Sequence, residues 1–486
     1  MTTSMTLYRL RRRAACALRG HKVGAFSLAL VSVLGGCTAF SPDGGFASVQ
    51  EIAKERLGKD VIWAKSDADR DIAERRVAEL LAKPLTVDDA VQVALLSNRR
   101  LQASFSELGI SEADMVQAGR LPNPHFAMLR ARNGDEFKIE QALTFNIFSL
   151  VVMPQALAIE QRRFERMQRL LALEVLTLAA DTRKAYYTAV SADETVRYME
   201  QVRKTADASA ELARRMAQIG NFNKLQQARE QGFYADAALN LARSQQAQTS
   251  AREKLTRLLG LWGQQINFRL PERLPDLPKL PNELPGIEQQ AMAQRLDVQA
   301  AKLEVEAMAK NLGLTKTTRF INVLEFGPAR VLEGQRSDPY KSGYEVSLEL
   351  PIFDWGTAKV ARAEAIYMQS VNLAAETAIN ARSEVRETYR LYRSTYDMAR
   401  HYRDEIVPLK KRIAEENMLR YNGMLIGVFE LLADARSQIA SVNGYIEALR
   451  DFWLAQADLD MAMIGKPSMS AAYKPSMAGA GVPAAH

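Results

Sequence analysis

Cys37 is the residue whose surroundings indicate the most definite chemistry. It follows the tripeptide LGG, whose small residues would let a signal peptidase approach a cysteine that is acylated before cleavage. Upstream, basic residues without any acid precede a short apolar run from Val23 to Val33. This run is too short to span a bilayer and is typical of a secretory signal. We therefore expect residues 1–36 to be a lipoprotein signal peptide and Cys37 to carry lipid. An ordinary signal with an incidental cysteine is the alternative.

The same targeting segment accounts for the charge of the chain. The formal net charge is +7, but most of this excess lies in the signal, so we expect no nucleic-acid-binding surface on the mature chain. Thr38 follows the cysteine. An aspartate at that position resembles an inner-membrane retention mark, and its absence points to the outer membrane. No later apolar run is long enough for a transmembrane helix, so a further membrane crossing would be made of strands.

Residues suited to catalysis or metal binding are isolated from one another. None of the four histidines has a partner at metal-ligand spacing; they are His21, His125, His401 and His486. The chain has no GxSxG, P-loop or GxGxxG motif. The 18 methionines could suggest copper handling, but most are spread along helical stretches, which favours core packing. We expect no enzymatic activity, no cofactor and no metal site.

Two copies of one unit make up most of the chain. One constant offset aligns Phe164 with Tyr367, Arg183 with Arg386, Tyr186 with Tyr389 and Gly220 with Gly423. A slightly smaller offset aligns Ala94 with Ala291, Ala103 with Ala300 and Glu107 with Glu304. Between the copies lies the stretch 270–286, LPERLPDLPKLPNELPG, whose prolines disfavour both helix and inner strand. We interpret it as a linker.

Each copy contains a long stretch with almost no proline, at about 154–260 and about 356–465. Leu, Ala and Val recur there at three- and four-residue spacing with Arg, Glu and Gln between them, which is the pattern of helices paired along a coiled-coil seam. A glycine interrupts each stretch, Gly220 in the first and Gly423 in the second. We predict one helical hairpin per copy, with a longer arm of roughly 90–100 Å if it is unbroken.

Short segments of alternating polarity precede each hairpin, at about 136–147 and about 343–352. A period of two over about ten residues suits a tilted strand with one face toward lipid and the other toward a lumen. A half-buried strand of a soluble sheet has the same pattern. Weaker partner strands are predicted at about 124–131 and 319–326. Four strands cannot close a barrel, and open edges are costly in lipid, so a membrane barrel would be shared among subunits.

Five segments follow one another in order over nearly the whole mature chain: PLTVDDAVQVALLSNRRLQ (84–102), QAGRLPNP ending at Pro124, GNFNKLQQAREQ (220–231), LPIFDWG (350–356) and YNGMLIGVFELLADARSQ (421–438). Together they resemble the TolC-type outer-membrane efflux factors. The resemblance implies a homotrimer whose twelve strands form one transmembrane β-barrel and whose hairpins form a periplasmic α-barrel. The expected fold class is mainly α with a small β part, four strands per chain contributing to the shared barrel.

In that family the two hairpin turns form a periplasmic tip, which closes the tunnel at rest and meets a periplasmic adaptor bound to an inner-membrane pump. The corresponding residues are Gly220, Asn221, Phe222, Lys224, Tyr421, Gly423, Met424, Leu425 and Gly427. Glycine suits such a turn because it accepts positive φ. The glycines also end helices whatever the function, and Tyr421, Met424 and Leu425 could instead pack in the helix seam.

Glu430 and Asp434 are four residues apart, hence on one helical face just past the second turn. Family members carry carboxylates there that resemble constriction rings, and threefold symmetry would turn each residue into a ring favouring cations. A solvated outer face is the alternative. Aligning the Ala-Arg pairs at 228–229 and 435–436 places Gln227 opposite Asp434 and requires an insertion of about one helical turn in the second copy.

These expectations define a domain organisation: signal peptide 1–36, N-terminal tether and equatorial segment 37–83, first repeat 84–269, linker 270–286, second repeat 287–465 and C-terminal tail 466–486. The resemblance implies a passive channel, lipid-anchored in the outer membrane and extending into the periplasm, which serves a tripartite efflux system. Two alternatives remain. A lipid-anchored adaptor or coiled-coil scaffold would usually have one hairpin flanked by β segments, and a periplasmic enzyme on a helical frame lacks a candidate site.

Overall fold

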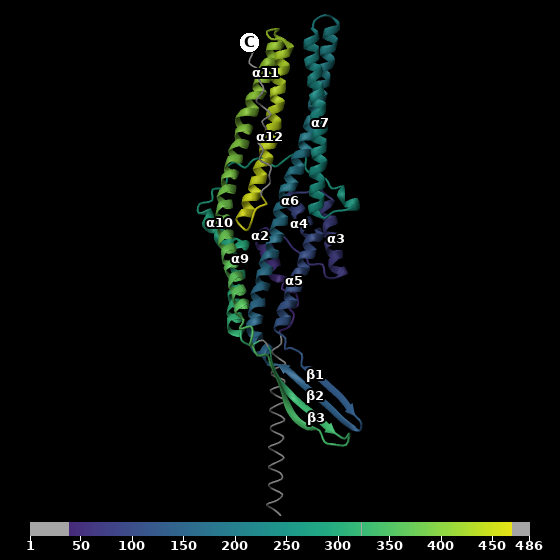
Figure 1. The fold of residues 1–486 in the computed structure, drawn as a ribbon. Helices are drawn as coiled ribbons and strands as arrows, with labels where there is room; N and C mark the ends of the chain where they lie inside the picture. Colours follow the sequence, from purple (N-terminus) through teal and green to yellow (C-terminus); the bar gives the residue numbers. More distant parts are fainter. Residues whose placement is uncertain (1–37, 322, 469–486) are drawn as a thin grey trace, which may run out of the picture. The chain divides into compact units, whose positions relative to one another are not determined.

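The computed structural model describes residues 38–321 and 323–468, so Cys37 and the expected signal peptide lie outside the described residues. The chain forms two compact units (Figure 1). In the described ranges, the first unit comprises residues 38–45, 108–165 and 303–371. The second comprises residues 46–107, 166–302 and 372–468. Each unit thus collects segments from both copies of the repeat.

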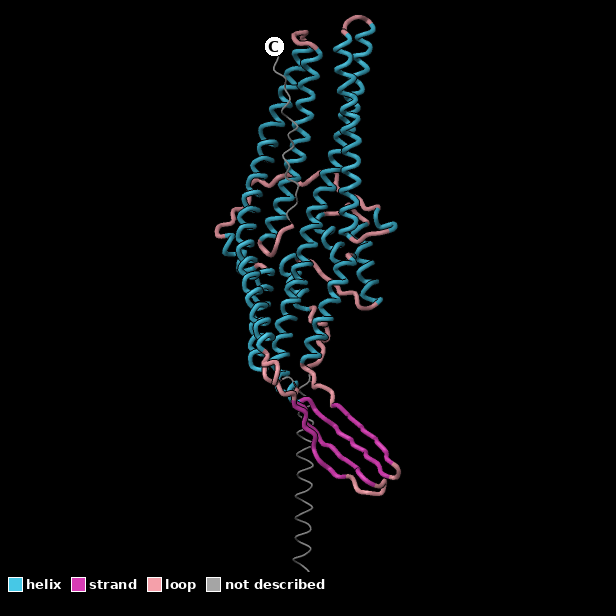
Figure 2. Tube along the Cα trace, in the orientation of Figure 1, coloured by secondary structure: helices cyan, strands magenta, loops and turns pink. Residues whose placement is uncertain are grey.

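The first unit contains an antiparallel sheet with the strand order β1-β2-β3-β4 (Figure 2). The strands are β1 His125–Asn133, β2 Glu136–Asn146, β3 Leu324–Gly334 and β4 Lys341–Leu348. Each neighbouring pair is antiparallel, and β2 is joined to β3 through the first hairpin and the linker. A mainly helical chain with one small four-stranded sheet is therefore confirmed.

The position predicted for the third strand, 319–326, is wrong. Helix α9 (Leu296–Thr318) continues almost to that point, and β3 runs on to Gly334. The Gly327-Pro328 pair would normally indicate a turn. Here a Cβ on residue 327 would lie 1.8 Å from the Leu143 carbonyl oxygen, so glycine permits close strand approach. Pro328 is paired with Tyr344 of β4 but with no residue of β2, because the β2–β3 ladder has a gap there. The missing N–H of the proline therefore costs no hydrogen bond to β2.

The two faces of the sheet differ, as a period of two predicts. The register places Phe145, Phe326 and Val346 in one row across three strands, and all three side chains are exposed. On the opposite face, Thr144 Oγ1 donates a hydrogen bond of 3.3 Å to the Glu325 carboxylate. One face of the sheet therefore carries an exposed apolar row, with the polar pair Gln141 and Arg330 farther along the same face, whereas the other face carries Thr144 and Glu325.

Two helical hairpins account for most of the second unit (Figure 1). The first consists of α6 (Ile147–Gln218) and α7 (Lys224–Leu259), the second of α10 (Thr357–His401), α11 (Val407–Asn422) and α12 (Val428–Ala462). The first hairpin was expected to begin at Pro154. Helix α6 begins earlier, at Ile147, and contains this proline near its N-terminal end. Within the described ranges, no helix is both long and apolar enough to cross a membrane.

The outgoing arm of the second hairpin is interrupted by a π-helical turn, Tyr402–Ile406. The Val407 N–H donates to the Tyr402 carbonyl, one residue beyond the usual α-helical acceptor. Pro408 is the next residue. It has no N–H to donate to the carbonyl group four residues earlier, and in a regular α-helix its ring would clash with that carbonyl group. The π turn therefore ends just before this proline, where the next α-helical segment begins.

Shorter helices complete the chain: α2 Ala47–Leu57, α3 Asp67–Leu81, α4 Val87–Ser97, α5 Arg99–Ala118, a 3₁₀ turn Gly263–Ile266 and α8 Ile287–Gln294. Helix α4 is buried over most of its length. Its side chains share one hydrophobic core with both hairpins, including Tyr186 of α6, Leu255 of α7 and Phe452 of α12. This core holds the bases of the two hairpins together in the second unit.

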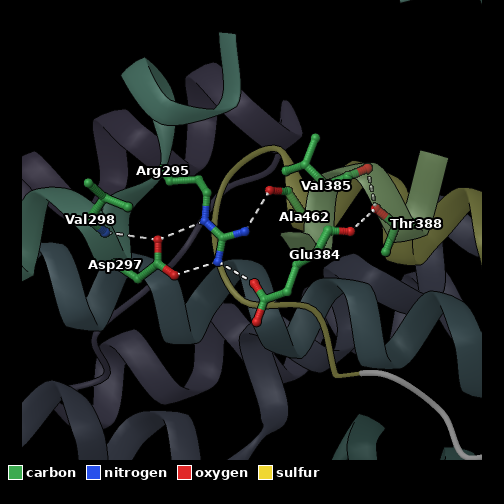
Figure 3. A network of polar contacts seen from close by, with 7 residues as sticks. All are labelled: Arg295, Asp297, Val298, Glu384, Val385, Thr388 and Ala462. Carbon is green, nitrogen blue, oxygen red and sulfur yellow. Dashed lines mark hydrogen bonds and ion pairs between the residues drawn. The ribbon is translucent and has the colours of Figure 1, made fainter. Parts of the chain in front are cut away.

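Equivalent polar residues secure the return arms in the two copies. Asn98 follows α4 and its amide donates to the Leu258 carbonyl of α7 at 2.9 Å. Arg295 follows α8 in the same way and donates to the Ala462 carbonyl at the end of α12 at 3.1 Å (Figure 3). The guanidinium, 1% exposed, also binds Asp297 at 3.0 and 2.6 Å and Glu384 at 2.7 Å.

The proline-rich linker is bound to both hairpins through its backbone. Trp453 Nε1 donates to the Pro275 carbonyl at 3.1 Å, and the Tyr396 hydroxyl donates to the Lys279 carbonyl at 2.7 Å. The Leu274 N–H donates to the Glu194 carboxylate of α6 at 3.1 Å. Prolines remove N–H donors, so the linker is recognised mainly through its carbonyl groups.

Burial raises the pKa of Glu194 above its ordinary value, and the Leu274 N–H only partly opposes this. A carboxyl with a raised pKa in the folded state contributes stability below the unfolded pKa of about 4.5, and this is lost as pH rises. We therefore expect Glu194→Gln, which can still accept from Leu274, to raise the melting temperature at pH 7. Thermal unfolding at pH 4 should show a smaller gain. An equal or larger gain at pH 4 would contradict this explanation.

Candidate functional site at the hairpin turns

The first turn connects α6 to α7 through residues 219–223. Gly220 has φ +82°, and a Cβ there would meet no atom within 4 Å, so the conformation rather than space requires glycine. The Asn221 and Phe222 N–H groups donate to the Met216 carbonyl at 2.9 and 3.2 Å, which closes the end of α6. Asn223 then caps α7 through a reciprocal hydrogen-bond pair with Gln226.

The second turn places its apolar residues in solvent. Met424 is 93% exposed and Leu425 is 74% exposed, while Tyr421 is partly exposed. Gly423 has an ordinary φ of −81°, so the expectation that it supplies positive φ is wrong. Met424 adopts φ +58° instead, among the described residues the only non-glycine with a positive φ. The strained backbone position therefore coincides with the most exposed apolar side chain of the turn.

Replacing Met424 with glycine should relieve this strain. A left-handed conformation costs an ordinary residue about 1–2 kcal/mol, whereas glycine accepts it at a smaller entropic cost. We expect Met424→Gly to leave the thermal stability of the hairpin unchanged or slightly higher. Leu425→Gly is the matched control, because Leu425 is also exposed but has no positive φ. Circular dichroism melting curves would contradict the prediction if Met424→Gly lost more stability than the control.

The two candidate gate acids differ in their surroundings. Glu430 is exposed in the first turn of α12, where Gly427 offers no side-chain cap. A carboxylate is favoured there by the exposed N–H groups and the dipole of the helix. Asp434 is half-buried and accepts a hydrogen bond from the Asn417 amide of α11. Glu430 is therefore the more accessible charge, and Asp434 is oriented within its own hairpin.

The turns have equal lengths, which corrects the alignment of the two copies. Helix α7 begins at Lys224 and α12 at Val428, and counted from these starts Glu230 is equivalent to Asp434. No insertion is needed, and Gln227 is not the counterpart. The alignment of the Ala-Arg pairs at 228–229 and 435–436 was wrong. Positions along the two return helices correspond when they are counted from the helix starts, not from a match of two residues. Both copies therefore carry a carboxylate at this position.

Glu230 contributes to a contact between the hairpins that the sequence did not reveal. Its carboxylate, 1% exposed, accepts from Ser209 Oγ at 2.7 Å and forms an ion pair of 2.8 Å with Arg436 of α12. The Arg436 guanidinium also stacks on the Phe233 ring at 4.2 Å. Nearby, the Tyr198 hydroxyl reaches the Ile439 carbonyl at 3.5 Å. These contacts join α12 to the first hairpin.

The structure thus brings the predicted residues into two turns, each on its own hairpin. It adds Ile219 and Leu225, two strongly exposed apolar side chains beside the first turn. The sequence did not single them out, because leucine and isoleucine are also the residues that pack along a helical seam. Among the described residues, no group of three or more His, Cys, Asp or Glu side chains is placed to hold a metal ion. The exposed groups at the turns include apolar side chains, the Glu430 carboxylate and the Lys224 ammonium group.

No model of a known protein family matches the chain. One curated relative, the cobalt-zinc-cadmium resistance protein CzcC of Cupriavidus metallidurans, is 24% identical over 279 residues, which are 56% of this chain and 64% of the relative. The chain therefore spans slightly less than two thirds of that relative's length.

Solved structures show the same fold. The outer-membrane channel MtrE of Neisseria gonorrhoeae, in its open state, matches with a TM-score of 0.64 and 18% identity over 78% of this chain and 89% of the channel. The outer membrane protein VceC of Vibrio cholerae matches with a TM-score of 0.65 and 14% identity over 78% of this chain and 96% of that protein. The chain has the fold of outer-membrane channel proteins, as the five sequence segments predicted.

Proposed function

We propose that the chain is the passive outer-membrane channel component of a tripartite efflux or export system. It carries substrates from an inner-membrane pump and a periplasmic adaptor across the periplasm and the outer membrane. The observation that supports this most directly is the combination, in one chain, of an open four-stranded sheet with an exposed row of apolar side chains and two long helical hairpins. An adaptor or scaffold would usually contain one hairpin, so the duplication favours the channel.

The sheet supports assembly with identical copies. Strands β1 and β4 each have only one neighbour within the described chain. Their outer edges carry unpaired N–H and C=O groups, which are too costly to leave open in lipid. A homotrimer solves this problem because β4 of one copy can pair with β1 of the next. Twelve strands would then form one transmembrane β-barrel, with the row of Phe145, Phe326 and Val346 toward lipid.

Lipid attachment at Cys37 would anchor each copy in the outer membrane. The residues that follow Cys37 support a defined attachment point in the first unit. The Ser41 N–H donates to the buried Glu112 carboxylate of α5 at 2.7 Å, and the Ser41 hydroxyl donates to the same oxygen. The tether is therefore bound close to its beginning by a helix that leads to β1.

The hairpin turns would be the docking site for a periplasmic adaptor. Met424 and Leu425 of the second turn and Ile219 beside the first are at least 70% exposed, and their burial against apolar helices of a partner would be favourable. We assign no catalysis to the chain. The energy and the choice of substrate would come from the pump.

Planar-bilayer conductance of detergent-extracted protein tests this function. We expect a trimeric mass and stable single-channel conductance. Cys37→Ser should weaken membrane attachment but leave the single-channel conductance unchanged, because the lipid lies outside the pore. A monomer that leaves the membrane when Cys37 alone is replaced, and that shows no conductance, would refute the channel.

A further inference from the structure

An open cavity of about 50 Å³ lies where three segments of the second unit meet. These segments are helix α3 with the loop before it, the junction of α4 and α5, and the loop after α7. Gly260 begins that loop with φ +68°, and a Cβ on it would lie 2.6 Å from the Ser97 carbonyl oxygen. Glycine therefore lets the loop close against the junction, which places Trp262 at the cavity.

The floor and the rim of this cavity have different chemistry. Ala73, Val77 and Leu96 are buried and form an apolar floor. Trp262, on the rim, is 76% exposed, which is unusual for so large an apolar side chain. Arg99 and Glu74, also in the lining, are exposed, and neither side chain has an ion-pair partner among the described residues. The cavity thus combines an accessible aromatic face with uncommitted polar groups.

The charges of the lining favour an anionic ligand. Arg70 and Arg99 contribute two guanidinium groups against the single carboxylate of Glu74. Arg70 is only partly committed, because its ion pair with Asp67 at 3.0 Å is exposed to solvent. Guanidinium groups bind carboxylates through paired N–H donors. A ligand carboxylate would therefore meet the Arg99 guanidinium, which is unpaired in the described part of the chain, and could bind that of Arg70 in exchange for its exposed pair with Asp67.

The remaining groups favour a sugar. An exposed indole offers a flat apolar face that suits the C–H face of a pyranose ring, and its N–H remains available to a hydroxyl. Glu74 and Gln265 are planar polar groups that can accept from or donate to further hydroxyls. Few polar groups placed beside an apolar surface are the usual means by which a pocket orients its ligand.

We propose that this surface, the Trp262 cavity, binds a glycan that carries carboxylates, which in the periplasm is the chemistry of peptidoglycan. The sugar ring stacks on Trp262 and a carboxylate lies between Arg70 and Arg99. The inference rests on the proposed function, because a channel that extends into the periplasm brings this surface to the cell wall. The contact would hold the channel in the wall without taking part in transport.

Co-sedimentation of the full chain with purified peptidoglycan sacculi tests the proposal. We expect Trp262→Ala and Arg99→Gln each to weaken binding roughly tenfold, the equivalent of about 1.4 kcal/mol. Trp355→Ala and Arg100→Gln are matched controls, because these side chains are also exposed but do not line the cavity. Both should bind as the unmodified chain does, and a neutral insoluble glucan should retain little of it.

Unchanged sedimentation of Trp262→Ala would overturn the proposal, as would equal binding to the neutral glucan. A loss of trimer mass in Trp262→Ala would also overturn it, because the surface would then be an interface between copies. Conductance is recorded on the same samples. Normal conductance without peptidoglycan binding refutes only the glycan site, whereas absent conductance in the unmodified chain refutes the channel.

Discussion

Arg295→Met is expected to lower the free energy of unfolding by about 3–5 kcal/mol, the usual cost of removing one partner from a buried ion pair. The Arg295 guanidinium is almost completely buried and binds Asp297, Glu384 and the Ala462 carbonyl (Figure 3). Methionine has a similar length but no donor. The variant would leave two carboxylates without their cation and the end of α12 without its donor.

Urea unfolding followed by circular dichroism measures this effect. Arg386→Met is the matched control, because Arg386 forms an exposed ion pair of 3.3 Å with Glu288, and such pairs contribute about 0–1 kcal/mol. Adding Asp297→Asn and Glu384→Gln to Arg295→Met should recover part of the loss, since the unpaired charges disappear. Equal losses in Arg295→Met and the control would show that the buried network does not hold the return arm.

Glu430→Gln is expected to reduce the cation selectivity of single channels several-fold. A ring of three Glu430 carboxylates around a threefold axis would attract cations, and neutral amides would not. Asp434→Asn should add a smaller change, because Asp434 is half-buried against Asn417. The double variant should be the least selective.

Reversal potentials in a salt gradient across a planar bilayer measure this selectivity. Glu415→Gln is the control, because Glu415 is an exposed acid of α11 that lies before the turn. Selectivity that stays constant in Glu430→Gln and in the double variant would place these acids on the outer face of the helices. A change in Glu415→Gln of the same size would show a general effect of charge.

Hairpins and strands could be predicted because their patterns are local. Spacing of apolar residues identifies the paired arms of α6 and α7, and alternation identifies β2. The predictions failed where a long-range contact overrides a local preference. Gly327 and Pro328 resemble a turn, yet they lie inside β3 because Leu143 approaches closely and the ladder has a gap. Met424 adopts a backbone conformation that sequence assigns to Gly423.

The candidate site was predicted in part for the same reason. The acids Glu430 and Asp434 and the turn residues follow from motifs near one another in the chain. Glu230 and Arg436 are far apart in sequence, and no pattern indicates that they form an ion pair between α7 and α12. Equal turn lengths, visible only in the structure, then identify Glu230 as the counterpart of Asp434.

By itself, the sequence determined the duplication, the two hairpins and the alternating strands. The hairpins and strands depend on residues a few positions apart, whose spacing reflects the period of one helix or strand, and the duplication depends on the recurrence of residue types at a constant offset. Only the tertiary structure decided the strand register, the partners of Arg295 and Glu230, and the cavity beside Trp262. These depend on close packing between distant segments, which spacing along the chain does not encode.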